Sequence, residues 1–232
     1  RFNGLLMNNA SLERERANLS RYFSPNVVEQ LSQNDEPLKQ VRSEHVAVMF
    51  IDIVGFTELS AGRDPREVIE LLRGFHGRME REVFRHGGTL DKYLGDGLMA
   101  TFGTPAAGKQ DATNALQCAR GMCASLTRWN TERRRAGEPE IRIGIGLHYG
   151  EVVLGDIGAN RLEYAVIGSA VNIASRLESL TRSLDAGIAM SADMHAQVAA
   201  ENPGTAALEG LTRCPGQLLK GIAEPMDVWI CK

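Results

Sequence analysis

The chain has 232 residues, 43% of them hydrophobic and 24% charged, which is enough for one substantial globular core or a core with a small appendage. Its formal net charge of -3 and its pI of about 6.0 provide no overall basic surface, so we do not expect nucleic acid as a partner. The four cysteines show neither CxxC spacing nor a neighbouring histidine cluster, which argues against a zinc site and a disulfide framework and favours a reducing compartment.

Residues 1–41 are predicted to form a helical lead-in to a single domain over residues 42–232. Ser24 followed by Pro25 is typical of a helix N-cap and first helical position. The lead-in is either a loosely packed arm or a coupling or dimerising helix, and the sequence favours neither. Because the chain begins with Arg1 rather than Met, we expect an upstream region with a sensor domain. No apolar run approaches the roughly 20 residues that span a bilayer, so we expect a cytoplasmic location, with any membrane attachment upstream.

The first predicted strand contains a carboxylate that needs a partner. Seven of the eight residues from Val46 to Ile53 are apolar, which is typical of a strand buried on both faces, yet Asp52 lies near its end. An unpaired buried carboxylate costs several kcal/mol. We therefore expect a cation or a network of hydrogen-bond donors beside Asp52.

A helix and a hairpin are predicted after this strand. Asp64 and Pro65 indicate the N-cap and first residue of a helix that ends at Gly87. Apolar residues recur through this helix at helical spacing, so one of its faces should lie on a sheet. The segment TLDKYLGDGLMATFG then predicts two short strands around a Gly95–Gly97 turn, with Asp96 in the turn.

The remaining elements continue the alternation of helices and strands. Residues 111–130 have a helical period with Cys118 and Cys123 in the core, and TERRRAGEPE after them indicates a solvated helix end. IRIGIGLHYGEVVLGDIG predicts a strand pair, EYAVIG leads into the helix SAVNIASRLESLTRS, and a strand, a helix and closing strands complete the chain. The order β-α-β-β-α-β-β-α-β favours an α+β fold with short helices packed on one face of a mixed sheet.

Asp52 and Asp96 are expected to converge if their strands are neighbours, which the single crossover helix between them allows. Two carboxylates at strand ends most often hold Mg²⁺ or Mn²⁺, hard cations that take one or two carboxylates plus phosphate oxygens. The Gly55 turn of VGFT, between them in sequence, offers backbone N–H groups to phosphate. Taken singly, Asp52 also fits a strand-end cap and Asp96 an ordinary turn aspartate.

Three ordered segments, FIDIVGFT, KYLGDGLMATFG and IGSAVNIASRLE, resemble the class III nucleotidyl cyclase catalytic domain of the bacterial adenylate cyclase type. The resemblance covers residues 42–232. It implies a ferredoxin-like β-α-β-β-α-β core with a C-terminal extension, in which helices pack on a mixed, mostly antiparallel sheet. It also implies a head-to-tail homodimer whose composite sites lie between the subunits.

The resemblance assigns roles to the residues that carry its motifs. Asp52 and Asp96 would bind two divalent cations, Mg²⁺ or Mn²⁺, with help from the Ile53 carbonyl. Asn172 and Arg176 are four residues apart, hence on one face of a helix. In the family the asparagine orients the ribose and the arginine stabilises charge on the transferring phosphoryl group. The other interpretation of this pair is a polar helix face.

The same resemblance implies a triphosphate site. Arg142 matches an arginine on the metal-bearing side, although a lone strand arginine is usually a surface charge. Lys220 matches a lysine that the partner subunit supplies, at a longer spacing than in some relatives. The backbone of the VGFT segment would complete the site through Val54, Gly55, Phe56 and Thr57.

Base recognition is where the chain departs from the family pattern. Lys92 falls where adenylate-forming members carry a lysine that donates to adenine N1, whereas guanylate-forming members usually carry glutamate. The acceptor for adenine N6 is expected seven residues before Asn172, and this chain has Ala165 there. Alanine has no side-chain acceptor, so we expect ATP to be preferred over GTP by a smaller ratio than in relatives with aspartate or threonine.

The sequence therefore predicts an adenylate cyclase that forms 3',5'-cyclic AMP and pyrophosphate by two-metal-assisted, in-line attack of the ribose 3'-oxygen on the α-phosphate. A guanylate cyclase, a cyclase of relaxed specificity, and a non-catalytic dimerisation or nucleotide-sensing module remain open. A diguanylate cyclase is disfavoured because LGDGL stands where GG(D/E)EF is expected.

Overall fold

The computed structural model describes residues 41–157, 163–222 and 224–232. Apart from Val41, the predicted lead-in lies outside the described residues, so its helical character stays a prediction. Within the described part, no helix is long and apolar enough to cross a membrane.

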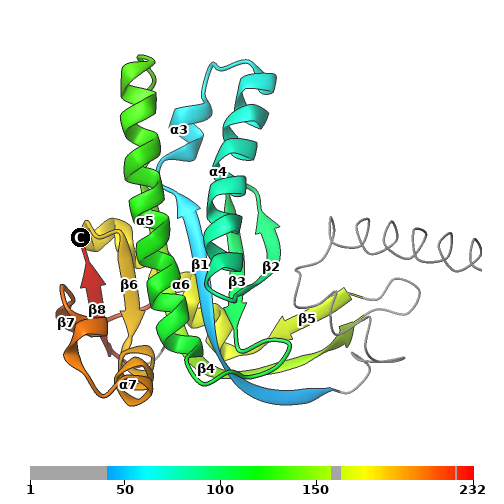
Figure 1. The fold of residues 1–232 in the computed structure, drawn as a ribbon, viewed down its shortest axis with the longest axis vertical. Helices are drawn as coiled ribbons and strands as arrows, with labels where there is room; N and C mark the ends of the chain where they lie inside the picture. Colours follow the sequence, from blue (N-terminus) through cyan, green and yellow to red (C-terminus); the bar gives the residue numbers. More distant parts are fainter. Residues whose placement is uncertain (1–40, 158–162, 223) are drawn as a thin grey trace, which may run out of the picture.

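The described elements follow the predicted alternation of strands and helices (Figure 1). They are β1 (Arg42–Ile53), α3 (Phe56–Ser60), α4 (Pro65–Arg85), β2 (Thr89–Leu94), β3 (Gly97–Phe102), α5 (Asp111–Arg135), β4 (Ile143–Ile157), β5 (Glu163–Ile167), α6 (Ser169–Leu184), β6 (Ile188–Ser191), α7 (Ala192–Glu201), the short 3-10 helix η1 (Thr205–Leu208), β7 (Thr212–Gln217) and β8 (Met226–Cys231).

The strands form one eight-stranded sheet in the order β2-β3-β1-β4-β6-β8-β7, with β5 paired to β4. The first four strands in this order, β2-β3-β1-β4, are the antiparallel arrangement of a ferredoxin-like core. Strands β6, β8 and β7 extend the core at its β4 edge, where β4 and β6 pair in parallel. The predicted α+β fold, mostly antiparallel with a C-terminal extension, is confirmed.

Helices cover both faces of this sheet, whereas the sequence predicted helices on one face. Helices α4 and α5 lie side by side across one face and bury alternate residues of β1, among them Met49 and Ile51 (Figure 1). Helix α6 covers the opposite face and packs against Val46 and Val48. The continuous apolar run of β1 is the physical reason, because a strand that is apolar on both sides needs two covering layers.

The segment predicted as a strand pair, IRIGIGLHYGEVVLGDIG, is instead the single strand β4, and its hairpin partner is β5. Its glycines are not turn residues. A Cβ on Gly146 would lie 2.1 Å from the Ala174 carbonyl oxygen and 2.2 Å from the Glu178 amide nitrogen. Glycine is therefore required there because the backbone of α6 rests directly on β4.

Helix α5 continues to Arg135, past the predicted end at residue 130. The expected solvated arginine run is only partly correct. Arg133 is 8% exposed, lies over the Trp129 ring and donates from Nε to the Pro139 carbonyl at 2.8 Å. The predicted core cysteine Cys118 is buried.

Replacing Gly146 with alanine is expected to destabilise the domain by about 3 kcal/mol or more, because α6 would have to move off the sheet. Gly77, inside α4, is the matched control, since no atom lies within 4 Å of an added Cβ there. Gly77→Ala should stabilise the domain by up to about 1 kcal/mol through helix propensity. Urea unfolding measures both. Equal denaturation midpoints for Gly146→Ala and the unchanged protein would contradict the close packing.

Candidate active site

The two predicted metal-binding carboxylates lie together where β1 ends beside the β2–β3 turn. Strands β1 and β3 pair directly, with Ile51 opposite Leu98, so the turn that holds Asp96 lies next to Asp52. A Cβ on Gly97 would lie 2.5 Å from the Ile51 carbonyl oxygen and 3.0 Å from Asp52 Oδ1. Gly97 therefore permits the β2–β3 turn to approach the end of β1, which any larger residue would obstruct. From the sequence, this glycine was expected only as a turn residue.

The environment of Asp52 disfavours its charge. Burial raises the pKa of Asp52 well above its ordinary value, and a hydrogen bond with the Asp96 side chain and the charges of Asp96 and Glu178 raise it further. The nearby Arg182 guanidinium opposes this shift. Such a carboxylate pair is a donor set that suits a hard divalent cation.

The cationic partner that the sequence required for Asp52 is Arg182, which the sequence did not identify. Arg182 Nη2 lies 2.9 Å from Asp52 Oδ2 and 3.2 Å from Glu178 Oε1. Both Glu178 and Arg182 come from the C-terminal half of α6. Their i,i+4 spacing in the sequence indicates an ion pair between Glu178 and Arg182. It does not indicate the contact of Arg182 with Asp52 on β1.

The VGFT turn joins β1 to the short helix α3. Gly55 has a positive φ of 72°, and its carbonyl accepts hydrogen bonds from the amides of Glu58 and Leu59. The Val54 amide donates to the Arg142 carbonyl at 2.8 Å. The structure thus brings the backbone of Arg142 to the turn that follows Asp52, as expected for one phosphate-binding edge.

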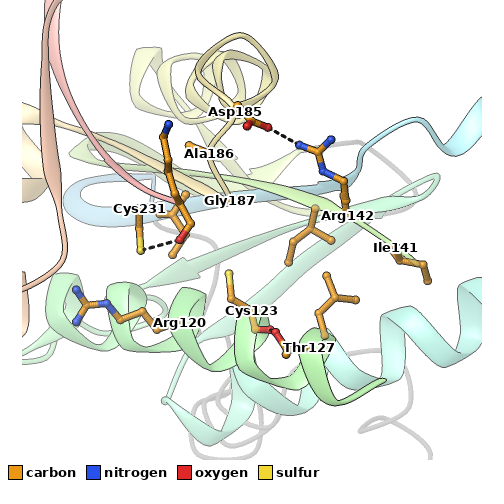
Figure 2. Close-up of a pocket in the computed structure, with 13 residues that line it drawn as sticks. Arg120, Cys123, Thr127, Ile141, Arg142, Asp185, Ala186, Gly187 and Cys231 are labelled. Atoms are coloured by element: carbon orange, nitrogen blue, oxygen red, sulfur yellow. Dashed lines mark hydrogen bonds and ion pairs between the residues drawn. The ribbon is translucent and has the colours of Figure 1, made fainter. Parts of the chain in front are cut away.

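The Arg142 side chain points to α6. Its Nη2 donates to Asp185 Oδ1 at 2.7 Å, and both side chains are mostly exposed (Figure 2). They line a cavity of about 410 Å³ between α5, the start of β4 and the C-terminal end of the described chain. Asp185 is thus the ion-pair partner of the guanidinium that the sequence assigned to triphosphate.

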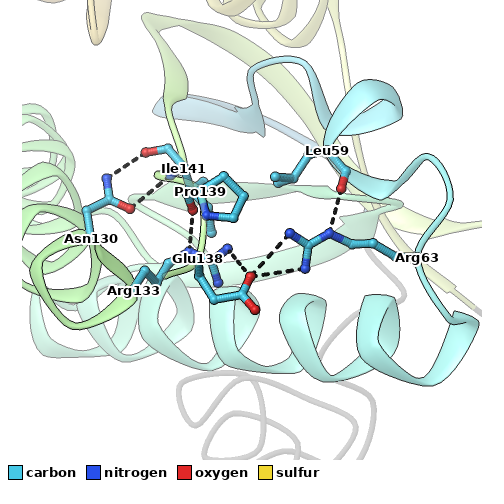
Figure 3. A network of polar contacts seen from close by, with 7 residues as sticks. All are labelled: Leu59, Arg63, Asn130, Arg133, Glu138, Pro139 and Ile141. Atoms are coloured by element: carbon cyan, nitrogen blue, oxygen red, sulfur yellow. Dashed lines mark hydrogen bonds and ion pairs between the residues drawn. The ribbon is translucent and has the colours of Figure 1, made fainter. Parts of the chain in front are cut away.

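A polar network links the chain around the end of α3, and the C-terminal part of α5, to the chain that enters β4 (Figure 3). Arg63 Nε donates to the Leu59 carbonyl at 2.8 Å, and the same guanidinium contacts Glu138 at 3.2 Å. Asn130 accepts from the Ile141 amide and donates to its carbonyl. These contacts join the end of α3 and the end of α5 to the segment that leads into β4.

The remaining predicted residues on α6 lie apart from the carboxylates. Asn172 is exposed near the start of α6, and Arg176 is half-buried one turn later. A Cβ on Gly221 would lie 3.2 Å from Arg176 Nη2, so this guanidinium rests on the turn that follows Lys220. The structure therefore brings Arg176 and the Lys220 turn together, at a distance from Asp52.

The base-recognition residues lie on other strands. Lys92 on β2 pairs with Met99, whose side chain packs in the cluster under α6, so both face the α6 side of the sheet. Its ammonium lies 3.4 Å from the Asp91 carboxylate. Ala165 is 4% exposed on β5, opposite Gly155 of β4. Lys92 and Ala165 thus lie on strands to either side of β1 in the sheet.

Spacing along α6 separates the two groups of residues. Asp52 contacts Arg182, which follows Arg176 by six residues and Asn172 by ten. At 1.5 Å per residue, these intervals are about 9 and 15 Å along the helix axis. Asn172 and Arg176 therefore lie nearer the N-terminal end of α6 than the residue that contacts Asp52.

Comparisons with known proteins identify the family to which this fold belongs. Residues 38–215 match the family model described as the adenylate and guanylate cyclase catalytic domain. The chain is 36% identical over 155 residues to adenylate cyclase 1 of Rhizobium meliloti and 37% identical over 151 residues to an adenylate cyclase of Anabaena cylindrica. These matches cover 66% and 63% of this chain but only 23% and 29% of the relatives, so the chain spans about a quarter of their length.

Solved cyclase structures share the fold. The crystal structure of the adenylyl cyclase CyaB from P. aeruginosa superposes with a TM-score of 0.72 at 29% identity, covering 82% of this chain and 95% of that one. A guanylyl cyclase crystal structure superposes with a TM-score of 0.70 at 31% identity, covering 82% of this chain and 92% of that one. Similarity therefore extends to cyclases named for either base.

Proposed function

The chain belongs to the family of adenylate and guanylate cyclase catalytic domains, and we propose that it converts ATP to 3',5'-cyclic AMP and pyrophosphate. The observation that carries the proposal is the Asp52 and Asp96 pair at the end of β1, where Gly97 of β3 leaves room for their close approach. A partly buried pair of acidic side chains costs stability unless something compensates it, and a nucleotide-bound cation would do so.

The residues present fit two divalent cations, Mg²⁺ or Mn²⁺. Asp52 and Asp96 would hold them with the Ile53 carbonyl. In the structure, Asp52 already has a cationic neighbour, because it forms an ion pair with the Arg182 guanidinium. When bound, such ions would activate the ribose 3'-oxygen and neutralise the phosphates. The described residues contain no cluster of three or more His, Cys, Asp or Glu side chains suited to a metal, so the phosphate oxygens would complete the coordination.

We further propose that two chains form each active site, head to tail. The separation along α6 supports this, because Arg176 and Asn172 lie about 9 and 15 Å along the helix axis from Arg182, the α6 residue that contacts Asp52 of the same chain. The partner chain's α6 would present its pair across the interface instead. The 3'-oxygen would bond to the α-phosphorus as the bond to pyrophosphate breaks.

The side chains divide the work between binding and charge stabilisation. Asn172 would orient the ribose, and Arg176 would stabilise negative charge that develops on the α-phosphate. The VGFT backbone and Arg142 would contact the triphosphate from the carboxylate side, and Lys220 from the partner side. The Arg142–Asp185 ion pair would be exchanged for a phosphate contact when substrate binds.

The preferred base would be adenine. Lys92 can donate to adenine N1, while Ala165 offers no acceptor to N6. This gap, together with the similarity to a guanylyl cyclase, supports relaxed specificity as the second candidate function.

Replacing Ala165 with threonine should raise the ratio of kcat/KM for ATP over GTP by about tenfold, because one new hydrogen bond to N6 is worth about 1 to 3 kcal/mol. Ala165→Val is the matched control, since valine has nearly the same shape without the hydroxyl. Steady-state kinetics with both nucleotides measures the ratio. The same ratio in the threonine and valine variants would contradict this account of base choice.

The experiment that tests the function is incubation of the chain with Mn²⁺ and either ATP or GTP, followed by chromatographic identification of the product. Gel filtration of the same sample establishes the dimer. Cyclic AMP from ATP supports the proposal. A dimer that forms no cyclic nucleotide from either substrate would instead be a non-catalytic cyclase-like module.

The longer protein is the subject of a separate proposal. Because the chain spans only 23% and 29% of its curated relatives, we propose that an upstream region carries a sensor domain. The cytoplasmic location expected from the sequence stays a prediction.

A further inference from the structure

Arg182 forms ion pairs with two acidic side chains through one guanidinium. Its Nη2 lies 2.9 Å from Asp52 Oδ2 and 3.2 Å from Glu178 Oε1, and Asp96 adjoins Asp52. The Arg182 and Asp52 side chains are 37% and 32% exposed, whereas that of Glu178 is 9% exposed. The Asp52 contact therefore lies at the open side of the cluster, and the Glu178 contact lies inside it.

The ordinary interpretation of Arg182 is an arginine that pairs with Glu178 one turn earlier on the same helix. That pair alone does not explain the geometry. The shortest contact of the guanidinium reaches from α6 to Asp52 on β1, which is 130 residues away in the chain. Arg182 thus bridges the helix to the strand end that carries the metal-binding carboxylate.

A divalent cation on Asp52 would encounter this guanidinium. Asp52 Oδ2 accepts a hydrogen bond from Arg182 Nη2, and two positive groups within about 4 Å of each other repel strongly in a partly buried site. Arg182 has an alternative partner, because its Nη1 also lies 3.4 Å from Glu178 Oε2. It can release Asp52 and remain paired on its own helix.

We propose that Arg182 is a displaceable counter-ion that occupies Asp52 in the nucleotide-free chain and thereby weakens metal binding until substrate arrives. The inference rests on the proposed function, since it takes Asp52 as a metal ligand. The triphosphate brings negative charge that offsets the guanidinium, so metal and nucleotide bind together more readily than metal alone. Arg182 is a positioning residue here and touches neither substrate nor the reacting atoms.

The test is the dissociation constant of Mn²⁺ for the nucleotide-free chain, measured from the electron paramagnetic resonance signal of free Mn²⁺. Arg182→Gln should bind Mn²⁺ about tenfold more tightly than the unchanged chain. Arg134→Gln is the matched control, because it removes the same charge from an exposed pair with Glu140 and should leave the affinity unchanged. Arg182→Lys, which keeps the charge, should lie between the unchanged chain and Arg182→Gln.

Two other results would overturn the inference in distinguishable ways. If Arg182→Gln and Arg182→Lys bind Mn²⁺ no more tightly than the unchanged chain, while Asp52→Asn binds it less tightly, the metal site stands and the counter-ion role fails. If the unchanged chain, Arg182→Gln and Asp52→Asn all bind Mn²⁺ equally, Asp52 is not a ligand and both proposals fail. Thermal unfolding with a chelator present checks that each variant is folded.

Discussion

Replacing Asp96 with asparagine is expected to lower the rate of cyclic nucleotide formation by about 1,000-fold or more. Asparagine keeps the shape of the side chain but removes the charge that would hold a divalent cation beside Asp52. A loss of several kcal/mol of transition-state stabilisation corresponds to this factor, at 1.36 kcal/mol for each tenfold. Single-turnover assays with saturating Mn²⁺ and ATP measure the rate.

The same change should leave the metal-free domain at least as stable as before. Asp52 and Asp96 share one partly buried site with a single guanidinium, so removing one carboxylate relieves repulsion. Thermal unfolding in a chelator should give an equal or higher Tm. Loss of activity without loss of stability separates a functional carboxylate from an ordinary turn aspartate.

The matched control is Asp64→Asn, at the N-cap of α4. The Asp64 side chain accepts a hydrogen bond from the Arg66 amide, and asparagine caps a helix about as well as aspartate. Its activity and Tm should both stay unchanged. An Asp96→Asn variant that keeps most of its activity would show that Asp96 is only a turn residue.

The proximity of Asp52 and Asp96 was predictable because its signals are local. The apolar run of β1, the carboxylate near its end and the GDG hairpin each depend on a few neighbouring residues. Because only one crossover helix separates β1 from the β2–β3 hairpin, few topologies are possible, and the pairing of β1 with a strand of this hairpin could be expected. The contact of Asp96 with Asp52 is the result.

Features that depend on long-range packing were not predictable. The partner of Asp52 is Arg182, 130 residues later, and nothing local in the sequence selects it over Arg176, the other arginine of α6. The segment that forms the single strand β4 was predicted as a strand pair, and the need for glycine at position 146 emerges only once the backbone of α6 lies against the strand.

The covering of both sheet faces by helices also depends on long-range packing and was not predicted. A strand that is apolar on both sides indicates two layers, but not which helix forms the second one. Helix α6 reads as an amphipathic helix like α4 and α5, so the sequence placed all of them together. Its position on the opposite face is what presents Asn172 and Arg176 on the side of the sheet where Asp52 lies.

Mixing two inactive variants is expected to restore activity if each site takes its carboxylates from one chain and its α6 pair from the other. In a heterodimer of Asp52→Asn and Arg176→Ala chains, one site carries both defects and the other carries neither. Random exchange of subunits at equal concentrations makes half of the dimers mixed, so about a quarter of the sites should be intact. Each variant alone should be nearly inactive.

The control mixture combines Asn172→Ala with Arg176→Ala. Both changes fall on the α6 half-site, so every composite site in the mixed dimer keeps one defect. This mixture should stay inactive although heterodimers form to the same extent. Copurification through a tag on one variant measures heterodimer formation in both mixtures.

The rate of cyclic AMP formation by the Asp52→Asn and Arg176→Ala mixture is the most direct test of the site built between two chains. Recovery of about a quarter of the unchanged activity, with none in the control mixture, is the predicted result. No recovery in a mixture that contains heterodimers would contradict it, because the carboxylates and the α6 pair would then have to act within one chain.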